Sequence, residues 1–315
     1  MSAALRAAHE VDFHGWRALR LEQGPLRLHV VPSVGGRLMG MEFEGRELAF
    51  INPDLEGRTW TPDEESTDPA AWKALCGAWA FPLWGGAKTW IAPESDWPNG
   101  VPHRDLDSGP WAVVDRWIDD DSMGVELESP VCRDSRLQLR RRLTLLRDAP
   151  RWRIDHRITN RGAEARHCGL WDVLMLARPA TVRAPLVASR PWREQVRALP
   201  GKPSIEELLE AKVLGLSEAD RIDIECGRAL EFKCGLDSEE GSMTASLAVG
   251  EMNIELERRS QVVAGAAYAH GHPLEVFNAP SLEYFEIESH SPCRVLQPGE
   301  SMAHSIEDSI RQPRS

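Results

Sequence analysis

Short runs of alternating apolar and polar residues dominate the chain, and this period of two is typical of β-strands with one buried face. Residues 26–30 and 37–43 alternate in this way on either side of a break at 32–36, and Glu44-Gly45-Arg46 predicts a tight turn into an apolar run at 48–51. Similar runs predict strands at 123–128, 137–146, 152–159, 167–176, 245–249, 252–257 and 282–288. Many short strands separated by turns predict an all-β, mostly antiparallel sandwich.

Helix signals are few. Ser204 and Glu207 form the sequence pattern of a capping box, which predicts a helix that continues through Val213 and stops near Gly215. A second short helix is expected over 69–75, with Asp68 as its N-cap.

Length and charge narrow the class of protein. The 315 residues are 42% hydrophobic and contain no linker or repeat, so we expect a single domain over 1–315 with an ordered core of about 10–312. The net charge of −12 argues against binding to nucleic acid, and the basic run 140–142 is explained by a solvated strand face. No stretch reaches the roughly 18 apolar residues of a membrane span, and the N-terminus lacks an apolar signal segment. A cytoplasmic protein without a membrane partner is expected.

Cysteine and tryptophan usage adds two expectations. The six cysteines show no CxxC spacing, so they are expected to be reduced core thiols rather than a zinc site. Eight of the 12 tryptophans fall between residues 60 and 117. Indole rings suit stacking on the C–H face of a sugar, although they also fill a wide core between sheets. Both interpretations remain open from the sequence.

The segment 82–110 contains much of this tryptophan and is also rich in glycine and proline, so we expect an irregular loop that forms the wall of a cleft. It combines the rings of Trp84, Trp90 and Trp97 with the polar residues Lys88, Glu94, Asp96, Asn99 and His103.

The predicted strand 282–288 contains an unusual pair of acids. Alternation places Tyr284, Glu286 and Glu288 on one face, with the two carboxylates about 7 Å apart along the strand. If that face lines a cleft, burial and mutual repulsion raise the pKa of one carboxyl group, as a general base or acid requires. If it faces solvent, the pair has no such role.

Three other positions carry candidate chemistry. His156 lies on an apolar strand face, and it is either a hydrogen-bonded core histidine or a catalyst. Arg141 interrupts another apolar face, and the sequence leaves open whether it binds a ligand or forms an internal ion pair. His270-Gly-His272 places two imidazoles on one predicted strand face, a spacing that suits a metal with a carboxylate as third ligand. Signatures of dinucleotide binding, phosphate loops, zinc proteases and serine hydrolases are absent from the sequence.

Three groups of segments, in order along the chain, resemble the aldose 1-epimerase or galactose mutarotase-like superfamily, in one of its bacterial branches. They are Val31-Pro-Ser-Val-Gly-Gly-Arg37 through Phe43 with Gly45 and Asn52-Pro53, then Ile158-Thr-Asn-Arg-Gly162 with Gly169-Leu-Trp-Asp172, and finally Glu286-Ile-Glu288 with Leu296-Gln-Pro-Gly-Glu300. The resemblance implies a galactose mutarotase-like β-supersandwich with an open sugar-binding cleft.

The resemblance also implies a mechanism. A glutamate of the C-terminal strand takes a proton from the anomeric hydroxyl, and a histidine supplies one to the ring oxygen. Glu286 or Glu288 matches that glutamate, and Arg37 matches an arginine on the substrate side. Trp171-Asp172 stands where the family has its histidine, and an indole does not exchange a proton near neutral pH.

Another acid must therefore substitute, or the reaction is not ordinary mutarotation. The candidates for the acid are His156, His270, His272 and Asp172.

Three functional hypotheses follow. The preferred one is an aldose 1-epimerase-like isomerase acting on a carbohydrate or polyol, without a cofactor or metal. The alternatives are a non-catalytic carbohydrate-binding protein with Trp84, Trp90 and Trp97 as a stacking platform, and a metal-dependent isomerase or lyase of a small polar metabolite. The expected catalytic residues are Glu288, Glu286, His156 and His270, and the expected substrate-binding residues are Arg37, Trp84, Lys88, Trp90, Glu94, Arg141, Trp171, Asp172 and His272. A monomer or a homodimer is expected.

Overall fold

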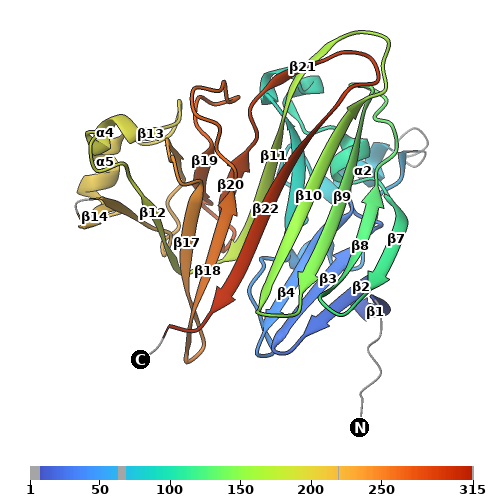
Figure 1. The fold of residues 1–315 in the computed structure, drawn as a ribbon, viewed down its shortest axis with the longest axis horizontal. Helices are drawn as coiled ribbons and strands as arrows, with labels where there is room; N and C mark the ends of the chain where they lie inside the picture. The colour runs from blue at the N-terminus through green and yellow to red at the C-terminus, as the bar shows by residue number, and fades with distance from the viewer. Residues whose placement is uncertain (1–7, 63–68, 219, 314–315) are drawn as a thin grey trace.

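The protein consists mainly of two large antiparallel sheets, one in front of the other (Figure 1). The structure, a computed structural model, describes residues 8–62, 69–218 and 220–313. The 12-stranded sheet has the order β1 (His9–Phe13), β2 (Trp16–Gln23), β3 (Leu26–Val31), β4 (Arg37–Phe43), β6 (Ala87–Ala92), β11 (Arg166–Ala177), β20 (Tyr284–His290), β19 (Leu274–Asn278), β16 (Phe232–Leu236) and β13 (Val196–Ala198), with β5 (Arg46–Glu47) on β4 and β21 (Arg294–Leu296) on β11.

The 10-stranded sheet lies toward the viewer in Figure 1. Its order is β14 (Leu214–Glu218), β15 (Arg221–Glu225), β12 (Ala180–Pro185), β17 (Ser242–Val249), β18 (Met252–Ser260), β22 (Ser301–Arg311), β10 (Arg151–Asn160), β9 (Leu137–Leu146), β8 (Ser122–Glu128) and β7 (Ala112–Ile118). The predicted all-β, mostly antiparallel sandwich is confirmed.

Helices are short, as the sequence predicts. They are α2 (Pro69–Cys76), α3 (Arg104–Asp107), α4 (Trp192–Gln195) and α5 (Ile205–Glu210), with single 3-10 turns η1 (Pro53–Leu55), η2 (Glu94–Asp96) and η3 (Pro98–Gly100). The capping box at Ser204 is present. The helix ends at Glu210, earlier than predicted, because Leu214 already pairs with β15. The predicted N-cap Asp68 lies outside the described residues.

The main hydrophobic core lies between the two sheets, and strand alternation fills it. On β10, Trp152, Ile154 and Ile158 are buried in this core, whereas Arg153 and Arg157 are exposed. All six cysteines are free thiols; five are buried, as predicted, whereas Cys293 is half-buried. In the described residues, no helix has the length and apolar character needed to span a membrane.

The 12-stranded sheet is covered on both faces. We call the face that turns away from the 10-stranded sheet the outer face. On β11, Leu170 and Leu174 belong to the core between the sheets, whereas Trp171 and Met175 belong to a separate outer-face cluster. Side chains from the connecting segments, such as Phe50, Trp97 and Ala279, complete that cluster.

The prediction that 82–110 is an irregular loop is wrong for its first part. Residues 87–92 form β6, a fully buried strand between β4 and β11. Because both of its faces are covered, β6 shows no polar alternation. Gly85, which precedes it at φ +102°, lies so close to the chain at Phe50 that a Cβ would be 2.2 Å from the Phe50 carbonyl oxygen.

Candidate functional site

Strand β20 presents its two acids to the outer face of the 12-stranded sheet. Phe285 and Ile287 point into the core between the sheets, and Tyr284 belongs to the outer-face cluster. Glu286 is 6% exposed and Glu288 is fully buried. The acid pair is therefore enclosed within the protein and does not face bulk water.

Glu286 forms an ion pair with Lys88 of β6. The Lys88 Nζ atom lies 3.1 Å from Glu286 Oε1 and 3.9 Å from the centroid of the Trp90 ring. Burial lowers the pKa of Lys88, and the negative charge of Glu286 opposes that shift. An ammonium donor and a carboxylate acceptor thus lie together beside an indole ring.

Glu288 is held from two sides. Trp171 Nε1 donates a hydrogen bond of 2.7 Å to Glu288 Oε2, and Lys233 Nζ of β16 donates one of 2.9 Å to the same oxygen. The other oxygen, Oε1, accepts no hydrogen bond from a described donor. Burial raises the pKa of Glu288 well above its usual range, and Lys233 only partly counteracts this effect.

A second buried carboxylate, Glu275 of β19, lies directly opposite Glu288 in the sheet register. Lys233 Nζ is 2.7 Å from Glu275 Oε2, so one ammonium contacts both acids. Lys233 and three imidazoles lower the pKa of Glu275 well below its usual range, although burial acts in the opposite direction. The two neighbouring carboxyl groups therefore differ strongly in proton affinity.

Three imidazoles converge on Glu275. His270 Nδ1 and His272 Nε2 lie 2.7 and 2.6 Å from Glu275 Oε1, and His290 Nε2 lies 3.2 Å from Oε2. His270 and His272 are in the turn before β19, so their predicted placement on a strand face is wrong. The His270 side chain is 13% exposed, which makes it the most accessible imidazole of the three.

The tryptophan wall consists of Trp90, Trp97 and Trp171. Their ring centroids lie 5.0 to 5.7 Å apart. The ring centroids of Trp171 and His270 lie 5.0 Å apart. Trp171 therefore contacts His270 through its ring and Glu288 through its N–H group. An acid, an imidazole and indole faces are therefore brought together at one place on the outer face.

Arg37 contributes to this wall indirectly. Its Nη2 atom lies 2.6 Å from Asp107 Oδ1, and the same oxygen accepts a 2.7 Å hydrogen bond from Trp90 Nε1. Arg37 is 1% exposed. Its ion pair with Asp107 therefore holds the Trp90 ring in place from inside the protein.

Two residues of segment 82–110 expected to bind substrate, Trp84 and Glu94, are not part of the tryptophan wall. Trp84 is fully buried in another cluster with Trp60 and Trp72, where its N–H group binds Ser108, so it offers no face for stacking. Glu94 is an exposed residue of η2. The prediction that Trp84 stacks on a substrate beside the acid pair is therefore wrong, whereas substrate binding by Glu94 stays a prediction.

The prediction that His156, Arg141 and Asp172 line the same cleft is also wrong. Asp172 follows Trp171 on β11 and therefore points to the opposite face, into the layer between the sheets. There His156 Nε2 lies 3.0 Å from Asp172 Oδ2, and Arg258 Nη1 lies 2.7 Å from Asp172 Oδ1. Arg141 contacts Thr89 in the same layer.

Metal binding at the imidazoles has limited support. Donor atoms of His270, Glu275 and His290 lie within 4.8 Å of one another, and His272 is not part of that set. However, the Lys233 ammonium is 2.7 Å from Glu275 and already supplies positive charge there. The arrangement therefore disfavours a divalent cation, because the Lys233 ammonium would repel it.

Sequence reasoning missed Glu275, Lys233, His290 and Asp107. His290 follows from extending the alternation of β20 by one step beyond Glu288. Glu275 and Lys233 are single charged residues within two largely apolar strands, Leu274–Asn278 and Phe232–Leu236, and a charge in an apolar segment is a signal that the sequence does contain. Asp107 has no such local signal, because its partner Arg37 is 70 residues away.

Comparisons with known proteins identify the fold. No family model matches the sequence, and no curated protein matches it. The Slr1438 protein of Synechocystis sp. PCC 6803 is 15% identical with a TM-score of 0.57, and the match covers 97% of this chain and 100% of that one. A galactose mutarotase-like protein from Clostridium acetobutylicum is 11% identical with a TM-score of 0.55, covering 97% and 98%. A protein of Escherichia coli K12 provisionally named an aldose 1-epimerase is 13% identical with a TM-score of 0.54, covering 94% and 99%.

Identities this low establish a fold and leave the reaction open. The solved structures extend over almost the whole chain, and they agree with the sequence segments that resemble the same superfamily. The chain therefore has the galactose mutarotase-like fold.

Proposed function

We propose that the outer face of the 12-stranded sheet binds an aldose and that the protein is an aldose 1-epimerase-like isomerase. The observation that carries this proposal is the placement of Glu288 and His270 around one indole: the Trp171 N–H group binds the carboxylate, and the Trp171 ring contacts the imidazole. A carboxyl group and an imidazole at one sugar ring are the two groups that opening of the ring requires.

In the proposed reaction, Glu288 and His270 carry one exchangeable proton between them. Glu288 takes the proton of the anomeric hydroxyl while His270 gives a proton to the ring oxygen, so the bond between the anomeric carbon and the ring oxygen breaks. After rotation of the free aldehyde, the same transfers run in reverse and close the ring on the other face. Protons are conserved over the cycle, and neither oxidant nor cofactor enters it.

Glu288 is preferred over Glu286 as the base for two reasons. Each acid pairs with a lysine through one oxygen, but the second oxygen of Glu288, Oε1, is buried and accepts no bond from a described donor, so it can take a proton. The pKa of Glu288 is raised by burial, which brings it closer to the pH at which it must exchange a proton. Glu286 and Lys88 are assigned to the sugar hydroxyls, as acceptor and donor, with Trp90 and Trp97 against the C–H face of the ring.

The test is the rate of exchange between anomers, measured by NMR on a panel of aldoses with purified protein. We expect Glu288→Gln to lower the catalysed rate by about 100-fold or more, because the base is removed while the size of the side chain is kept. His270→Gln should have a similar effect, and Glu286→Gln should act mainly on KM. Glu283→Gln, an exposed neighbour just before β20, is the matched control and should leave the rate unchanged.

If Glu288→Gln and wild type accelerate exchange equally, the assignment of the base is wrong. A protein that binds a sugar by calorimetry and does not accelerate exchange supports the second candidate, a carbohydrate-binding protein. The observation that favours this candidate is Trp171 itself, because it stands at the position where the resembling family has its histidine.

A further inference from the structure

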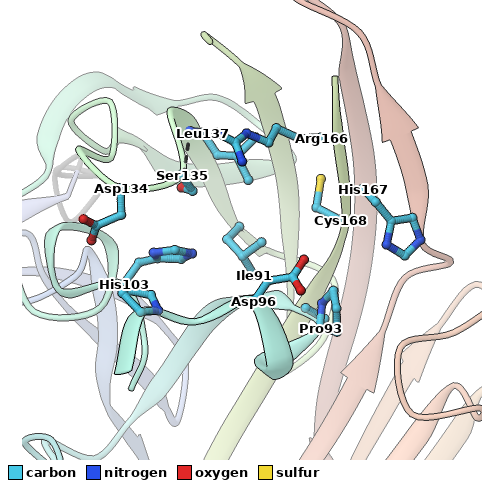
Figure 2. A pocket seen from close by; sticks show the side chains of 12 residues that line it. Ile91, Pro93, Asp96, His103, Asp134, Ser135, Leu137, Arg166, His167 and Cys168 are labelled. Atoms are coloured by element: carbon cyan, nitrogen blue, oxygen red, sulfur yellow. Dashed lines mark hydrogen bonds between the residues drawn. The ribbon is translucent and has the colours of Figure 1, made fainter. Parts of the chain in front are cut away.

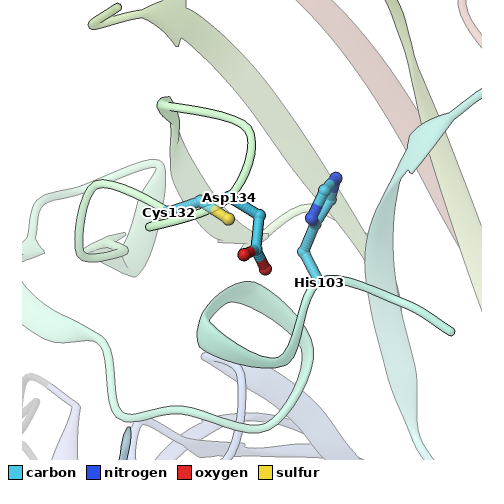
Figure 3. Close-up of side chains that lie close together, drawn as sticks. All are labelled: His103, Cys132 and Asp134. Carbon is cyan, nitrogen blue, oxygen red and sulfur yellow. The ribbon is translucent and has the colours of Figure 1, made fainter. Parts of the chain in front are cut away.

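A second group of side chains with metal-binding chemistry lies outside the outer-face site. His103 is the residue before α3, and Cys132 and Asp134 belong to the turn between β8 and β9. One donor atom from each lies within 4.8 Å of the other two. Figure 3 shows the Cys132 sulfur and the Asp134 carboxylate in the space beside the His103 imidazole.

The two loops are fixed to each other independently of any ligand. Arg133, between Cys132 and Asp134, donates its backbone N–H to Asp105 Oδ2 at 2.9 Å and its Nη2 to Asp105 Oδ1 at 2.9 Å. Asp105 is two residues from His103 and is 4% exposed. The backbone bond from Cys132 N–H to the Leu137 carbonyl, at 2.9 Å, closes the turn. The three donors are therefore held near one another before a ligand arrives.

One ring nitrogen of His103 lacks a hydrogen-bond partner in the described residues. His103 is 6% exposed, and its Nδ1 atom has no hydrogen-bond partner among the residues that the structure describes. A buried polar atom without a partner is destabilising. Cys132 is completely buried and is a free thiol. A bound cation would give the imidazole a partner, and the Cys132 sulfur would be a second ligand of the same ion.

We propose that His103, Cys132 and Asp134 bind a borderline-soft divalent metal ion of the Zn²⁺ class. Nitrogen, sulfur and carboxylate donors together select such an ion over Mg²⁺ or Ca²⁺, which prefer oxygen ligands alone. Tetrahedral bond lengths of about 2.0–2.3 Å require donors roughly 3.5 Å apart, so side-chain rotations close the remaining distance. This differs from the zinc site that the cysteine spacing argues against, because only one cysteine takes part.

The fourth coordination position has space available. His103 and Asp134 line a cavity of about 260 Å³ that also includes Asp96, Arg166 and His167 (Figure 2). Figure 2 shows His103 and Asp134 on one side of this cavity and Arg166 and Cys168 on the other. Three protein ligands next to a cavity leave room for water or a small ligand as the fourth.

The test uses the full-length protein, stripped of metal, with Zn²⁺ titrated by calorimetry and Co²⁺ titrated by absorbance. We expect one equivalent to bind and the Co²⁺ complex to show a thiolate-to-metal charge-transfer band, which the cluster of His270, Glu275 and His290 cannot produce. Cys132→Ser should remove the band, and Asp134→Asn should weaken Zn²⁺ binding by at least 10-fold. Asp134 is exposed, so its variant should remain folded.

Cys76→Ser, a buried free thiol elsewhere, is the matched control and should bind Zn²⁺ like wild type. Arg133→Gln should lower the affinity by about 10-fold while the charge-transfer band remains, because it positions the ligands without binding the metal. The proposal is overturned if wild type shows no charge-transfer band, or if Asp134→Asn and Cys132→Ser bind Zn²⁺ as tightly as wild type. Glu288→Gln leaves this binding unchanged, so the site is tested separately from the isomerase.

Discussion

Lys233 balances the buried acids of the outer face. Its ammonium lies 2.7 Å from Glu275 and 2.9 Å from Glu288, and its side chain is 13% exposed. The two acids are directly opposite each other on neighbouring strands, an arrangement that is unfavourable for like charges. The pair can therefore be buried only together with a positive charge at this position.

We expect Lys233→Met to destabilise the protein by about 3–5 kcal/mol, because it leaves buried carboxylates without their counter-charge. Urea unfolding measures this loss. Lys202→Met is the matched control: its side chain is 28% exposed and pairs with Glu231, so its removal should cost about 1 kcal/mol or less. Adding Glu288→Gln to Lys233→Met should recover part of the lost stability. Equal stability of the two lysine variants would contradict the assigned role.

At the scale of single residues, the sequence predicts the sheet face to which a side chain points better than it predicts which side chains it contacts. The shared face of Glu286 and Glu288 follows from strand alternation, which is a local property. That Lys233 contacts Glu288 depends on β16, β19 and β20 being neighbours, and no local pattern contains this order. The same missing information explains the wrong prediction for Asp172. Strand alternation places Asp172 and Trp171 on opposite faces of the sheet, but the sequence does not show which of these faces a substrate reaches.

At the scale of elements, β16 and the turn before β19 approach each other closely. Gly235 of β16 lies under the His272 ring, and a Cβ at this position would be 2.1 Å from His272 Cε1. Because residue 235 is glycine, the turn can pack against this strand with His272 in hydrogen-bond contact with Glu275.

We expect Gly235→Ala to displace His272 and to destabilise the protein by about 1–3 kcal/mol, the usual cost of overpacking. Gly215→Ala in β14 is the control, since a Cβ there meets nothing within 4 Å, and it should leave stability nearly unchanged. Denaturant midpoints compare the two variants. A Gly235→Ala protein as stable as the control would show that the turn adapts at no cost.

Elements defined by local hydrogen bonds are the ones that the sequence predicts best. The cap at Ser204 is an example, because the two bonds of its capping box, Glu207 N–H to Ser204 Oγ and Ser204 N–H to Glu207 Oε2, join residues three apart. Strand β6 is the counterexample: Lys88 and Trp90 lie on a strand whose two faces are both covered, so the alternation that identifies half-buried strands is missing.

At the scale of the whole molecule, a polar network joins the two sheets through their common core. Arg258 of β18 bonds Asp308 and reaches Asp172 on the opposite sheet. Arg258 and His156 hold the pKa of Asp172 well below its usual range, although burial opposes them. His304 of β22 lies in this layer, where burial lowers its pKa from 6.5 to about 4.

The shifted pKa of His304 predicts how stability depends on pH. The groups that face it are His156, Asp172, Arg258 and His290. Between pH 6.5 and 4 the unfolded chain binds a proton at His304 that the folded protein does not. This contribution to stability is therefore present above pH 6.5 and is lost as the pH falls, at about 1.4 kcal/mol per pH unit.

We expect His304→Gln to flatten the pH profile by about 2 kcal/mol between pH 7.5 and 5. Urea unfolding at both pH values measures the difference. His167→Gln, an exposed histidine on β11, is the control and should keep the wild-type profile. A variant at His304 with the wild-type pH profile would show that this imidazole is not neutral in the folded protein.

The cover over the outer face determines when the proposed chemistry begins. Glu288 is fully buried, and His270 belongs to the segment 261–273, whose glycines Gly265 and Gly271 have open space around them. Under the proposed function, a sugar reaches the carboxyl group only if this segment is displaced, and such a displacement carries His270 away from Trp171. Return of the segment then brings the imidazole and the carboxyl group together around a bound sugar, so substrate enclosure and assembly of the acid–base pair are coupled.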